Sequence, residues 1–320
     1  MIRALLAMLL AAGMAANAAA PAAAQDPGSL RLADDFEEGG FSAAGGLYYK
    51  DNAEQRAGSV VFQPRVVRQG RSAVELTVRS QCGATNNECS ERAEVWEKPS
   101  VLARYDQTVW YAFSMRLADP VPTQRHRYVM AQWKREIIPG AEGDYSPFLA
   151  LRMTGGKLFF TIDTDTVPTF PLGGPDRPNG CRPGEAAVTA QTGVGQTRAI
   201  VAMEAGATPT DYGAYTACTP HIQVTPRGVL PAATSGWIDF VIMVQPSPRG
   251  GGKIEIAANG SWVASVAGNI GHEGPGLGVN QYFKFGPYRA GRPEPWTVFY
   301  DRFRRGPACT DVTDALSCPR

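Results

Sequence analysis

The stretch Gln281-Tyr282-Phe283-Lys284-Phe285-Gly286-Pro287-Tyr288-Arg289 is the clearest strand signal in the chain. Because side chains on a β-strand alternate between its two faces, Tyr282 and Lys284 point one way and the two phenylalanines point the other. One face is therefore polar and the other packs on a core. We expect the Gly-Pro pair to end the strand and to place Tyr288 and Arg289 just beyond it. A phenol beside cations can have its pKa lowered to a catalytically useful value, although an ordinary amphipathic strand shows the same pattern.

Short alternating runs of this kind recur along the chain and are separated by turn residues. Val109–Leu117 and Arg127–Arg135 are two examples, and Phe148–Met153 with Lys157–Asp163 has the pattern of a hairpin. Helical periodicity is scarce, whereas Gly occurs 35 times and Pro 25 times. The pattern predicts an all-β fold, a sandwich or jelly roll of two antiparallel sheets formed by one large domain.

The N-terminus has the features of a secretory signal peptide. After Met1-Ile2-Arg3 the chain is apolar and then Ala-rich as far as Ala24, with Ala-x-Ala cleavage patterns. We therefore expect a signal peptide at residues 1–24 and a mature domain at 25–320, which is secreted or periplasmic. No later run of the sequence is long and apolar enough to span a bilayer, so no membrane association is expected.

The charge balance excludes an overall polyanion-binding surface. The chain has 31 Lys and Arg against 30 Asp and Glu, and Arg3 belongs to the expected signal peptide. The mature net charge is therefore close to zero, which gives no indication of nucleic acid as a partner. An anionic polymer would have to be bound by a local patch of cations.

The six cysteines form three sequential pairs, each around a polar or Gly/Pro-rich loop. This favours the disulfides Cys82–Cys89, Cys181–Cys218 and Cys309–Cys318 in an oxidising compartment. A zinc site is the weaker alternative, because no Cys-x-x-Cys occurs.

Residues 167–235 lack a clear strand pattern and contain several prolines, which exclude a regular central strand. Cys181 and Cys218 both lie in this segment. We interpret it as a disulfide-pinned insertion that either overhangs a cleft or is a purely structural excursion.

Three predicted strands each present a polar face. The first carries Arg92 and Glu94, the second carries Gln132 and Lys134 with His126 shortly before it, and the third carries Tyr282 and Lys284 and leads to Tyr288. Ordinary explanations remain for several of them: a cross-strand salt bridge for Arg92 with Glu94, a solvated face for Lys134 and a surface loop for His126.

Together these polar faces resemble the β-jelly-roll polysaccharide lyases, the heparin-lyase-like, alginate-lyase-like and glucuronan-lyase-like group with a concanavalin-like sandwich. The alginate-lyase branch has the motifs Arg-[Ser/Thr]-Glu-Leu, Gln-Ile-His and Tyr-Phe-Lys-Ala-Gly-x-Tyr. The corresponding residues here are Arg92-Ala93-Glu94-Val95, Gln132-Trp133-Lys134 and Tyr282-Phe283-Lys284-Phe285-Gly286-Pro287-Tyr288, in the same order. The resemblance covers most of the mature chain. It departs at Lys134, where the family has histidine, and this leaves the identity of the base open.

The resemblance implies a concave substrate cleft and β-elimination on a polysaccharide that contains uronic acid. Arg92 and Gln132 would neutralise the sugar carboxylate, and Tyr288 would transfer the proton at C5, the proton to the leaving oxygen, or both. Lys134 or His126 would assist as base or carboxylate clamp. The remaining candidates, which would bind substrate or lower the tyrosine pKa, are Glu94, Tyr282, Lys284 and Arg289.

The partner implied by the resemblance is an anionic polysaccharide, such as glucuronan, alginate or a glycosaminoglycan-like polymer, acted on by a monomer. We expect no required cofactor or catalytic metal, while a structural calcium ion is left open. A carbohydrate-binding, lectin-like protein without activity is the main alternative. A glycoside hydrolase is a weaker one, because a strand would turn Glu94 away from Glu91 and Glu97, and two carboxylates must flank the bond.

Overall fold

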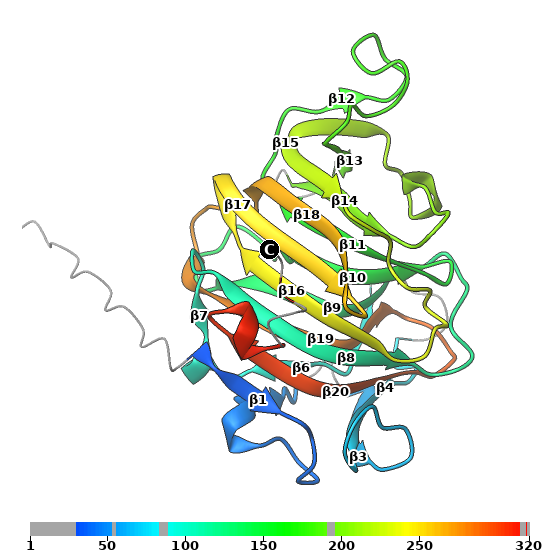
Figure 1. The fold of residues 1–320 in the computed structure, drawn as a ribbon, viewed down its shortest axis with the longest axis vertical. Coiled ribbons are helices and arrows are strands. Elements are labelled where there is room, and N and C mark those ends of the chain that lie inside the picture. Colours follow the sequence, from blue (N-terminus) through cyan, green and yellow to red (C-terminus); the bar gives the residue numbers. More distant parts are fainter. Residues whose placement is uncertain (1–29, 53–55, 83–88, 191–195, 314–317, 319–320) are drawn as a thin grey trace, which may run out of the picture.

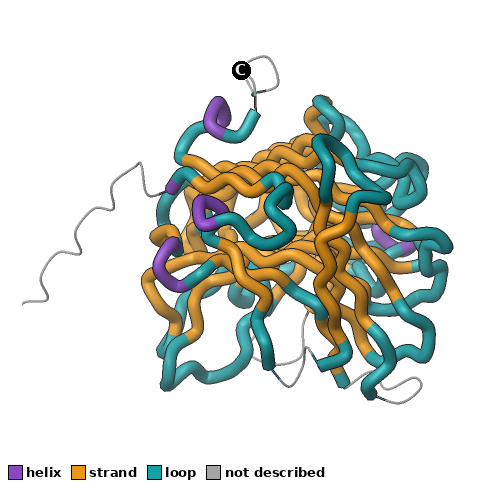
Figure 2. The backbone as a smooth tube through the Cα atoms, turned by 90° about the horizontal axis from the view of Figure 1, so that it is seen from below, coloured by secondary structure: helices purple, strands orange, loops and turns teal. Residues whose placement is uncertain are grey.

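The computed structural model describes residues 30–52, 56–82, 89–190, 196–313 and 318 (Figure 1). These residues contain no α-helix, and strands make up most of the backbone (Figure 2). Their helical turns are the short 3-10 segments η2 (Ala43–Gly45), η4 (Pro99–Val101), η5 (Pro209–Asp211) and η6 (Cys309–Asp311). None of the helices in these ranges has the length and apolar character to cross a membrane. The expected signal peptide at 1–24 lies outside the described residues.

One antiparallel sheet, here called the back sheet, is built around β20. Its order is β3–β4–β20–β8–β16–β17–β18, and β1 pairs with the C-terminal half of β20. Its strands are β1 (Leu32–Asp34), β3 (Gly58–Gln63), β4 (Ala73–Val78), β8 (Val109–Leu117), β16 (Ile238–Gln245), β17 (Ser247–Ala258), β18 (Ser261–Ile270) and β20 (Trp296–Gly306).

The second antiparallel sheet, here called the front sheet, is built around β19. On one side β19 pairs with the short strands β5, β6 and β7, and on the other the order continues β9–β10–β11–β14–β13–β15. Its strands are β2 (Leu47–Tyr49), β5 (Ser90–Arg92), β6 (Val95–Glu97), β7 (Ala103–Arg104), β9 (Tyr128–Ile137), β10 (Leu149–Thr154), β11 (Lys157–Thr164), β12 (Phe170–Pro171), β13 (Glu185–Ala190), β14 (Thr197–Met203), β15 (Ala217–Pro226) and β19 (Leu277–Ala290). β15 also pairs with β18, which joins the two sheets at that end. The predicted all-β jelly-roll sandwich is confirmed.

The core lies between the two sheets and is rich in aromatic side chains. Phe283 and Phe285 of β19 are buried, as their alternation predicts. The ring of Phe283 lies 5.5 Å from that of Phe113 on β8, and the ring of Phe285 lies 4.7 Å from that of Tyr300 on β20. Large buried rings contribute much of the hydrophobic stabilisation of such a core. Because the face of β19 with Phe283 and Phe285 packs on this core, its polar side chains lie on the opposite face.

β19 does not end at Gly286-Pro287, and that part of the prediction is wrong. The strand continues to Ala290 through an irregularity in its pairing with β9, between Phe285 and Tyr288. A bulge accommodates Pro287, which has no amide hydrogen, and its carbonyl accepts a hydrogen bond of 2.9 Å from the amide of Ala93. Gly286 has a φ of 128°, and a Cβ there would lie 2.1 Å from the carbonyl oxygen of Ala93, so this position requires glycine.

The described part of residues 167–235 contains regular strands, which also corrects the prediction. These strands are β12, β13, β14 and β15, and β14 extends the front sheet directly from β11. Figure 1 shows β12, β13 and β15 (green to yellow-green) at one end of the molecule. Most of the prolines lie in the connections, where no ladder hydrogen bond is lost. The predicted disulfides Cys82–Cys89, Cys181–Cys218 and Cys309–Cys318 are all confirmed.

Candidate active site

The three strands that carry the predicted site residues are neighbours in the front sheet. β19 lies between β9 and the pair β5 and β6, so that Tyr288 is opposite Arg92 and Lys284 is opposite Gln132. Tyr282 is opposite Lys134 in the same ladder. The sequence prediction that these residues share one sheet is therefore confirmed, and the polar face of β19 faces away from the aromatic core.

Glu94 is the centre of a buried group of polar side chains. Its Oε2 accepts hydrogen bonds from Nζ of Lys284 at 2.9 Å and from Nη1 of Arg92 at 3.3 Å, and its Oε1 accepts one from Nε2 of Gln132 at 2.5 Å. Burial alone would raise the pKa of Glu94, but Lys284 and Arg92 together hold it below its usual value. Glu94 is thus an ionised anchor that orients two cations and an amide, and its oxygens are already occupied by protein donors.

Lys284 is the most enclosed cation of this group. It is 2 % exposed, and its ammonium lies 4.4 Å from the centroid of the Trp96 ring. Burial lowers the pKa of Lys284 to about 8, an effect that Glu94 opposes and that Arg92 and Lys134 reinforce. Lys284 can therefore change its charge within an ordinary assay range.

Lys134 and Tyr282 line a hollow of about 390 Å³ together with Arg92 and Lys284. Nζ of Lys134 forms an ion pair of 2.9 Å with Asp144, which belongs to the loop after β9. The ring of Tyr282 stacks on Trp96 with the centroids 5.2 Å apart, and burial raises the pKa of its hydroxyl. Tyr282 is therefore a wall of the hollow and is held as a neutral phenol.

Tyr288 lies between two guanidinium groups. The carbon at the centre of the Arg92 guanidinium is 3.8 Å from the centroid of the Tyr288 ring, and that of Arg127 is 4.8 Å from it. These contacts are cation–π interactions, which the electron-rich face of a phenol favours. The cations beside Tyr288 are thus Arg92 and Arg127, whereas the sequence pointed to Lys284 and Arg289.

Arg289 does not face the candidate site, which corrects the prediction. Because it follows Tyr288 on the same strand, its side chain points to the opposite face, where it is 1 % exposed. Its Nε donates a hydrogen bond of 2.7 Å to Glu91, and its other nitrogens bind the carbonyls of Glu294 and Arg292. Arg289 therefore neutralises a buried carboxylate.

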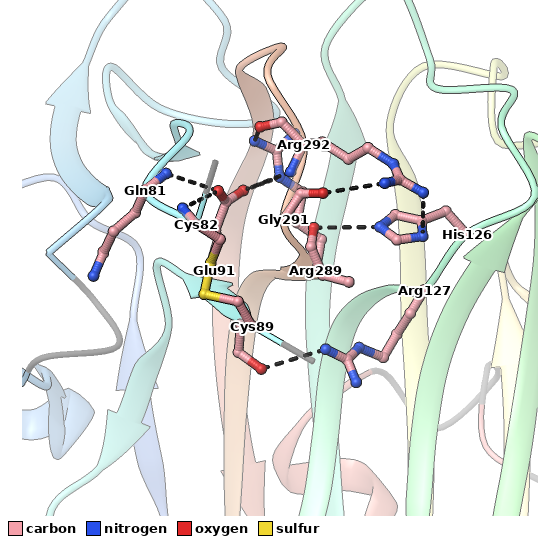
Figure 3. Close-up of a disulfide and its surroundings, with 11 residues drawn as sticks. Gln81, Cys82, Cys89, Glu91, His126, Arg127, Arg289, Gly291 and Arg292 are labelled. Carbon is pink, nitrogen blue, oxygen red and sulfur yellow. Dashed lines mark hydrogen bonds and ion pairs between the residues drawn. A yellow bond between two sulfur atoms is a disulfide. The ribbon is translucent and has the colours of Figure 1, made fainter. Parts of the chain in front are cut away.

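His126 is likewise engaged away from the Glu94 group. Its Nδ1 is 2.8 Å from Nη2 of Arg292, and its Nε2 is 3.3 Å from the carbonyl of Ala290 (Figure 3). Since arginine can only donate, Nδ1 accepts and Nε2 donates. Burial, followed by the nearby arginines, lowers the pKa of His126, although the Ala290 contact opposes this. Both nitrogens of a neutral ring are thus occupied.

We predict that Glu91→Gln destabilises the fold by about 3–5 kcal/mol, because it leaves the buried Arg289 charge without a counter-charge. Glu91 is fully buried beside the Cys82–Cys89 disulfide, and its Oε1 also accepts the amides of Gln81 and Cys82 (Figure 3). Denaturant unfolding measures the loss. Glu75→Gln is the matched control, because its partner Arg65 is exposed and 3.7 Å away. Equal stability of both variants would contradict this account of Arg289.

The sequence did not point to several charged residues in and beside the candidate site. They are Asp144, Arg127, Arg152 and Arg198. Arg152 was detectable in principle, because it interrupts the apolar run Leu149-Ala150-Leu151-Arg152-Met153, and a charge inside a buried strand requires a partner or a role. The other three depend on loops and register that local patterns do not specify.

A family model described as polysaccharide lyase matches residues 36–304 of this sequence. The chain belongs to the polysaccharide lyase family. The match spans both sheets and includes Arg92, Gln132, Lys134 and Tyr288. The protein is thus an enzyme, a lyase that acts on polysaccharides.

Solved structures agree with the fold of the lyase. The crystal structure of an endo-β-1,4-glucuronan lyase from the fungus Trichoderma reesei matches with a TM-score of 0.57 and 15% identity, over 90% of this chain and 98% of that one. An alginate lyase, Aly36B, matches with a TM-score of 0.40 and 10% identity, over 86% of this chain and 96% of that one. No curated protein sequence matches the chain. At 15% identity the match to the glucuronan lyase supports the jelly-roll architecture alone.

Proposed function

We propose that this lyase cleaves a polysaccharide containing uronic acid by β-elimination and leaves 4,5-unsaturated uronate ends. The observation that carries the proposal is the position of Tyr288, a phenol that two guanidinium groups flank, beside the Glu94 group with its cations Arg92 and Lys284. A uronate needs this combination, because its negative carboxylate makes the C5 proton very weakly acidic.

In the proposed mechanism the sugar carboxylate binds at Arg92, with Lys134 and Lys284 adding positive charge. The Tyr288 oxygen accepts the C5 proton, and the electron pair of that bond moves onto the carboxylate as an enediolate, which the cations stabilise. The pair then forms the C4–C5 double bond while the C4–O bond breaks. The electron pair of the C4–O bond leaves with the oxygen, which takes the proton from Tyr288.

The other residues of the candidate site do not react but hold the cations in place. Glu94 holds Arg92 and Lys284, and Gln132 holds Glu94, through the hydrogen bonds given above, so that little reorganisation is needed when charge develops. His126 has no role in this scheme, since both its nitrogens bind other groups. The proposal thus assigns the proton transfers to Tyr288 and positive charge to Lys134.

Absorbance at about 235 nm, where unsaturated uronates absorb, tests the proposed function. The fold relative from Trichoderma reesei acts on glucuronan, so glucuronan is the first polymer to test, followed by alginate and glycosaminoglycans. We expect absorbance to rise with at least one of them. Reducing ends that appear without absorbance, or no reaction with any uronate polymer, would refute the β-elimination.

We further propose that the lyase is exported by the signal peptide at residues 1–24 and acts as a monomer. The three disulfides support an oxidising compartment. N-terminal sequencing of the mature protein from the medium or periplasm should begin at Gln25, and an intact Met1 would contradict the proposal.

We predict that substrate affinity falls as the pH rises through about 8, because Lys284 then loses its charge. In the unfolded chain the pKa of a lysine is about 10.4. Between a pH of about 8 and this value, the unfolded state binds more protons than the folded state. The contribution of Lys284 to the free energy of unfolding therefore rises with pH in this range. A KM that increases while unfolding measurements show no loss of stability would confirm the prediction. A KM that is flat from pH 7 to pH 10 would refute it.

We predict that turnover does not depend on a divalent metal ion. The scheme takes its positive charge from Arg92, Lys134 and Lys284, and each carboxylate among them is paired with a cation. The described residues also contain no group of three or more His, Cys, Asp or Glu suited to a metal. Activity after treatment with EDTA should be unchanged. Complete loss that one divalent ion restores would contradict this, whereas a fall in thermal stability alone would indicate the structural calcium ion.

A further inference from the structure

A second hollow, of about 380 Å³, is lined by Arg127, which contacts the Tyr288 ring. Four arginines lie in its walls: Arg125, Arg127, Arg152 and Arg198. Tyr215 comes from the segment 167–235, which therefore forms one wall of the hollow. Among its described lining residues Asp211 is the one carboxylate, and it caps η5 and pairs with Lys157.

Tyr288 contacts one wall residue of each hollow. Arg127 lines the second hollow and also stacks on the Tyr288 ring, whose other neighbour, Arg92, lines the first hollow. The Tyr288 hydroxyl is near enough to influence the pKa values of both Arg152 and Arg198. A chain lying across Tyr288 would therefore reach both hollows.

Arg152 carries a buried charge that the described part of the chain does not neutralise directly. It is 8 % exposed, and its Nε donates a hydrogen bond of 2.8 Å to the neutral hydroxyl of Thr161. None of the described carboxylates forms an ion pair with it, because the nearby Asp163 is bound by both Nε and Nη2 of Arg198. Burial and then the like charge of Arg198 lower the pKa of Arg152 to about 10, and a buried charge normally has a partner.

Arg127 also has a guanidinium nitrogen without a hydrogen-bond partner among the described residues. Its Nη2 donates a hydrogen bond of 3.3 Å to the Ser90 hydroxyl, while Nε is the buried nitrogen that has no such partner. The hollow thus holds two guanidinium groups that pair with no carboxylate among the described residues. A planar anion with two oxygens fits such donors better than a single atom does, since arginine binds carboxylates with two parallel hydrogen bonds.

We propose that the hollow around Arg152 is an anion subsite that binds the carboxylate of a second acidic sugar, next to the sugar that reacts at Tyr288. This rests on the proposed function and adds that the lyase requires acidic units on both sides of the reacting position. Arg198 is held by Asp163, so Arg152 and Arg127 supply the free donors. A sulfate group on a sugar has oxygens that could bind the same donors. The experiment below distinguishes a carboxylate from a sulfate.

Arg152→Gln in the full-length lyase tests the subsite. The substitution removes the charge and keeps an amide that can still bind Thr161. We expect KM and the equilibrium Kd for a defined acidic oligosaccharide to rise roughly tenfold, the contribution of one charge-assisted pair, with kcat within about twofold. The same oligosaccharide with its carboxyls reduced to alcohols should bind wild type and variant equally.

The matched control is Arg116→Gln, which removes the same charge from β8 of the back sheet. It should leave Kd and KM unchanged. If Arg152→Gln lowers the thermal stability, Arg152→Lys replaces it, and we expect a smaller rise in Kd because a cation remains without the two-pronged geometry.

The outcomes separate the subsite from the proposed function. A wild-type enzyme that forms unsaturated uronate, with Kd and KM unchanged in Arg152→Gln, would overturn the subsite alone. A wild-type enzyme that neither binds nor cleaves any acidic polymer would overturn both. An equal loss of affinity for a sulfated neutral polysaccharide would overturn the assignment to a carboxylate.

Discussion

Tyr288→Phe is expected to lower kcat by about 10²–10⁴-fold, the usual contribution of a general acid–base group. The substitution keeps the aromatic ring, so the stacking of Arg92 at 3.8 Å and Arg127 at 4.8 Å is retained. It removes the one atom that carries the proton in the proposed mechanism. Stopped assays at about 235 nm measure the rate, and the Kd for the polymer should stay near the wild-type value.

Tyr282→Phe is the matched control, because the same atom is removed from the same strand. Tyr282 stacks on Trp96, and burial raises the pKa of its phenol, so its hydroxyl keeps its proton at ordinary pH and cannot act as a base. The rate should change by less than about tenfold. If Tyr288→Phe retains wild-type turnover, the proton transfers belong to another group, and Lys134 is the first to examine.

The sequence predicted the strands of this site well because alternation is a local property. Phe283 and Phe285 had to share a face opposite Lys284 whatever the strand was paired with, and they are the residues that pack between the sheets. The disulfides were predictable for a similar reason, since each pair is close in sequence or encloses one segment.

The bulge at Gly286-Pro287 was not predictable from local signals. Gly-Pro normally ends a strand, and only the partner strand shows why it does not do so here: Ala93 donates its amide to Pro287 across the ladder. The bulge matters for the candidate site, because it keeps Tyr288 in the sheet opposite Arg92. A tyrosine placed beyond the strand end would have had Arg289 as its neighbour.

The second hollow was missed because it depends on contacts between distant segments. Arg127 precedes β9, Arg152 lies in β10, and Arg198 lies in β14, within a segment whose prolines concealed its strands. Their approach follows from the order β9–β10–β11–β14 in the front sheet. No spacing in the sequence encodes that order.

Arg92→Gln is expected to lower kcat/KM by about 10²–10³-fold, the usual effect of removing one donor that stabilises developing charge. Arg92 is the point where the polar group and the proton-transferring residue meet: it binds Glu94 at 3.3 Å and stacks on Tyr288. Steady-state kinetics on the polymer identified by the absorbance screen measure the effect. Arg104→Gln on β7 is the control, because its partner Asp106 is exposed.

Arg92→Lys distinguishes the chemical role of Arg92 from a structural one. Lysine retains the charge but has no planar group to stack on Tyr288 or to bind a carboxylate with two hydrogen bonds, so we expect it to recover only part of the activity. If Arg92 were merely one half of a salt bridge with Glu94, both substitutions would lower the unfolding free energy and leave kcat/KM intact. Because Lys284 still neutralises Glu94 in either variant, we expect the opposite pattern, with stability largely kept and turnover lost.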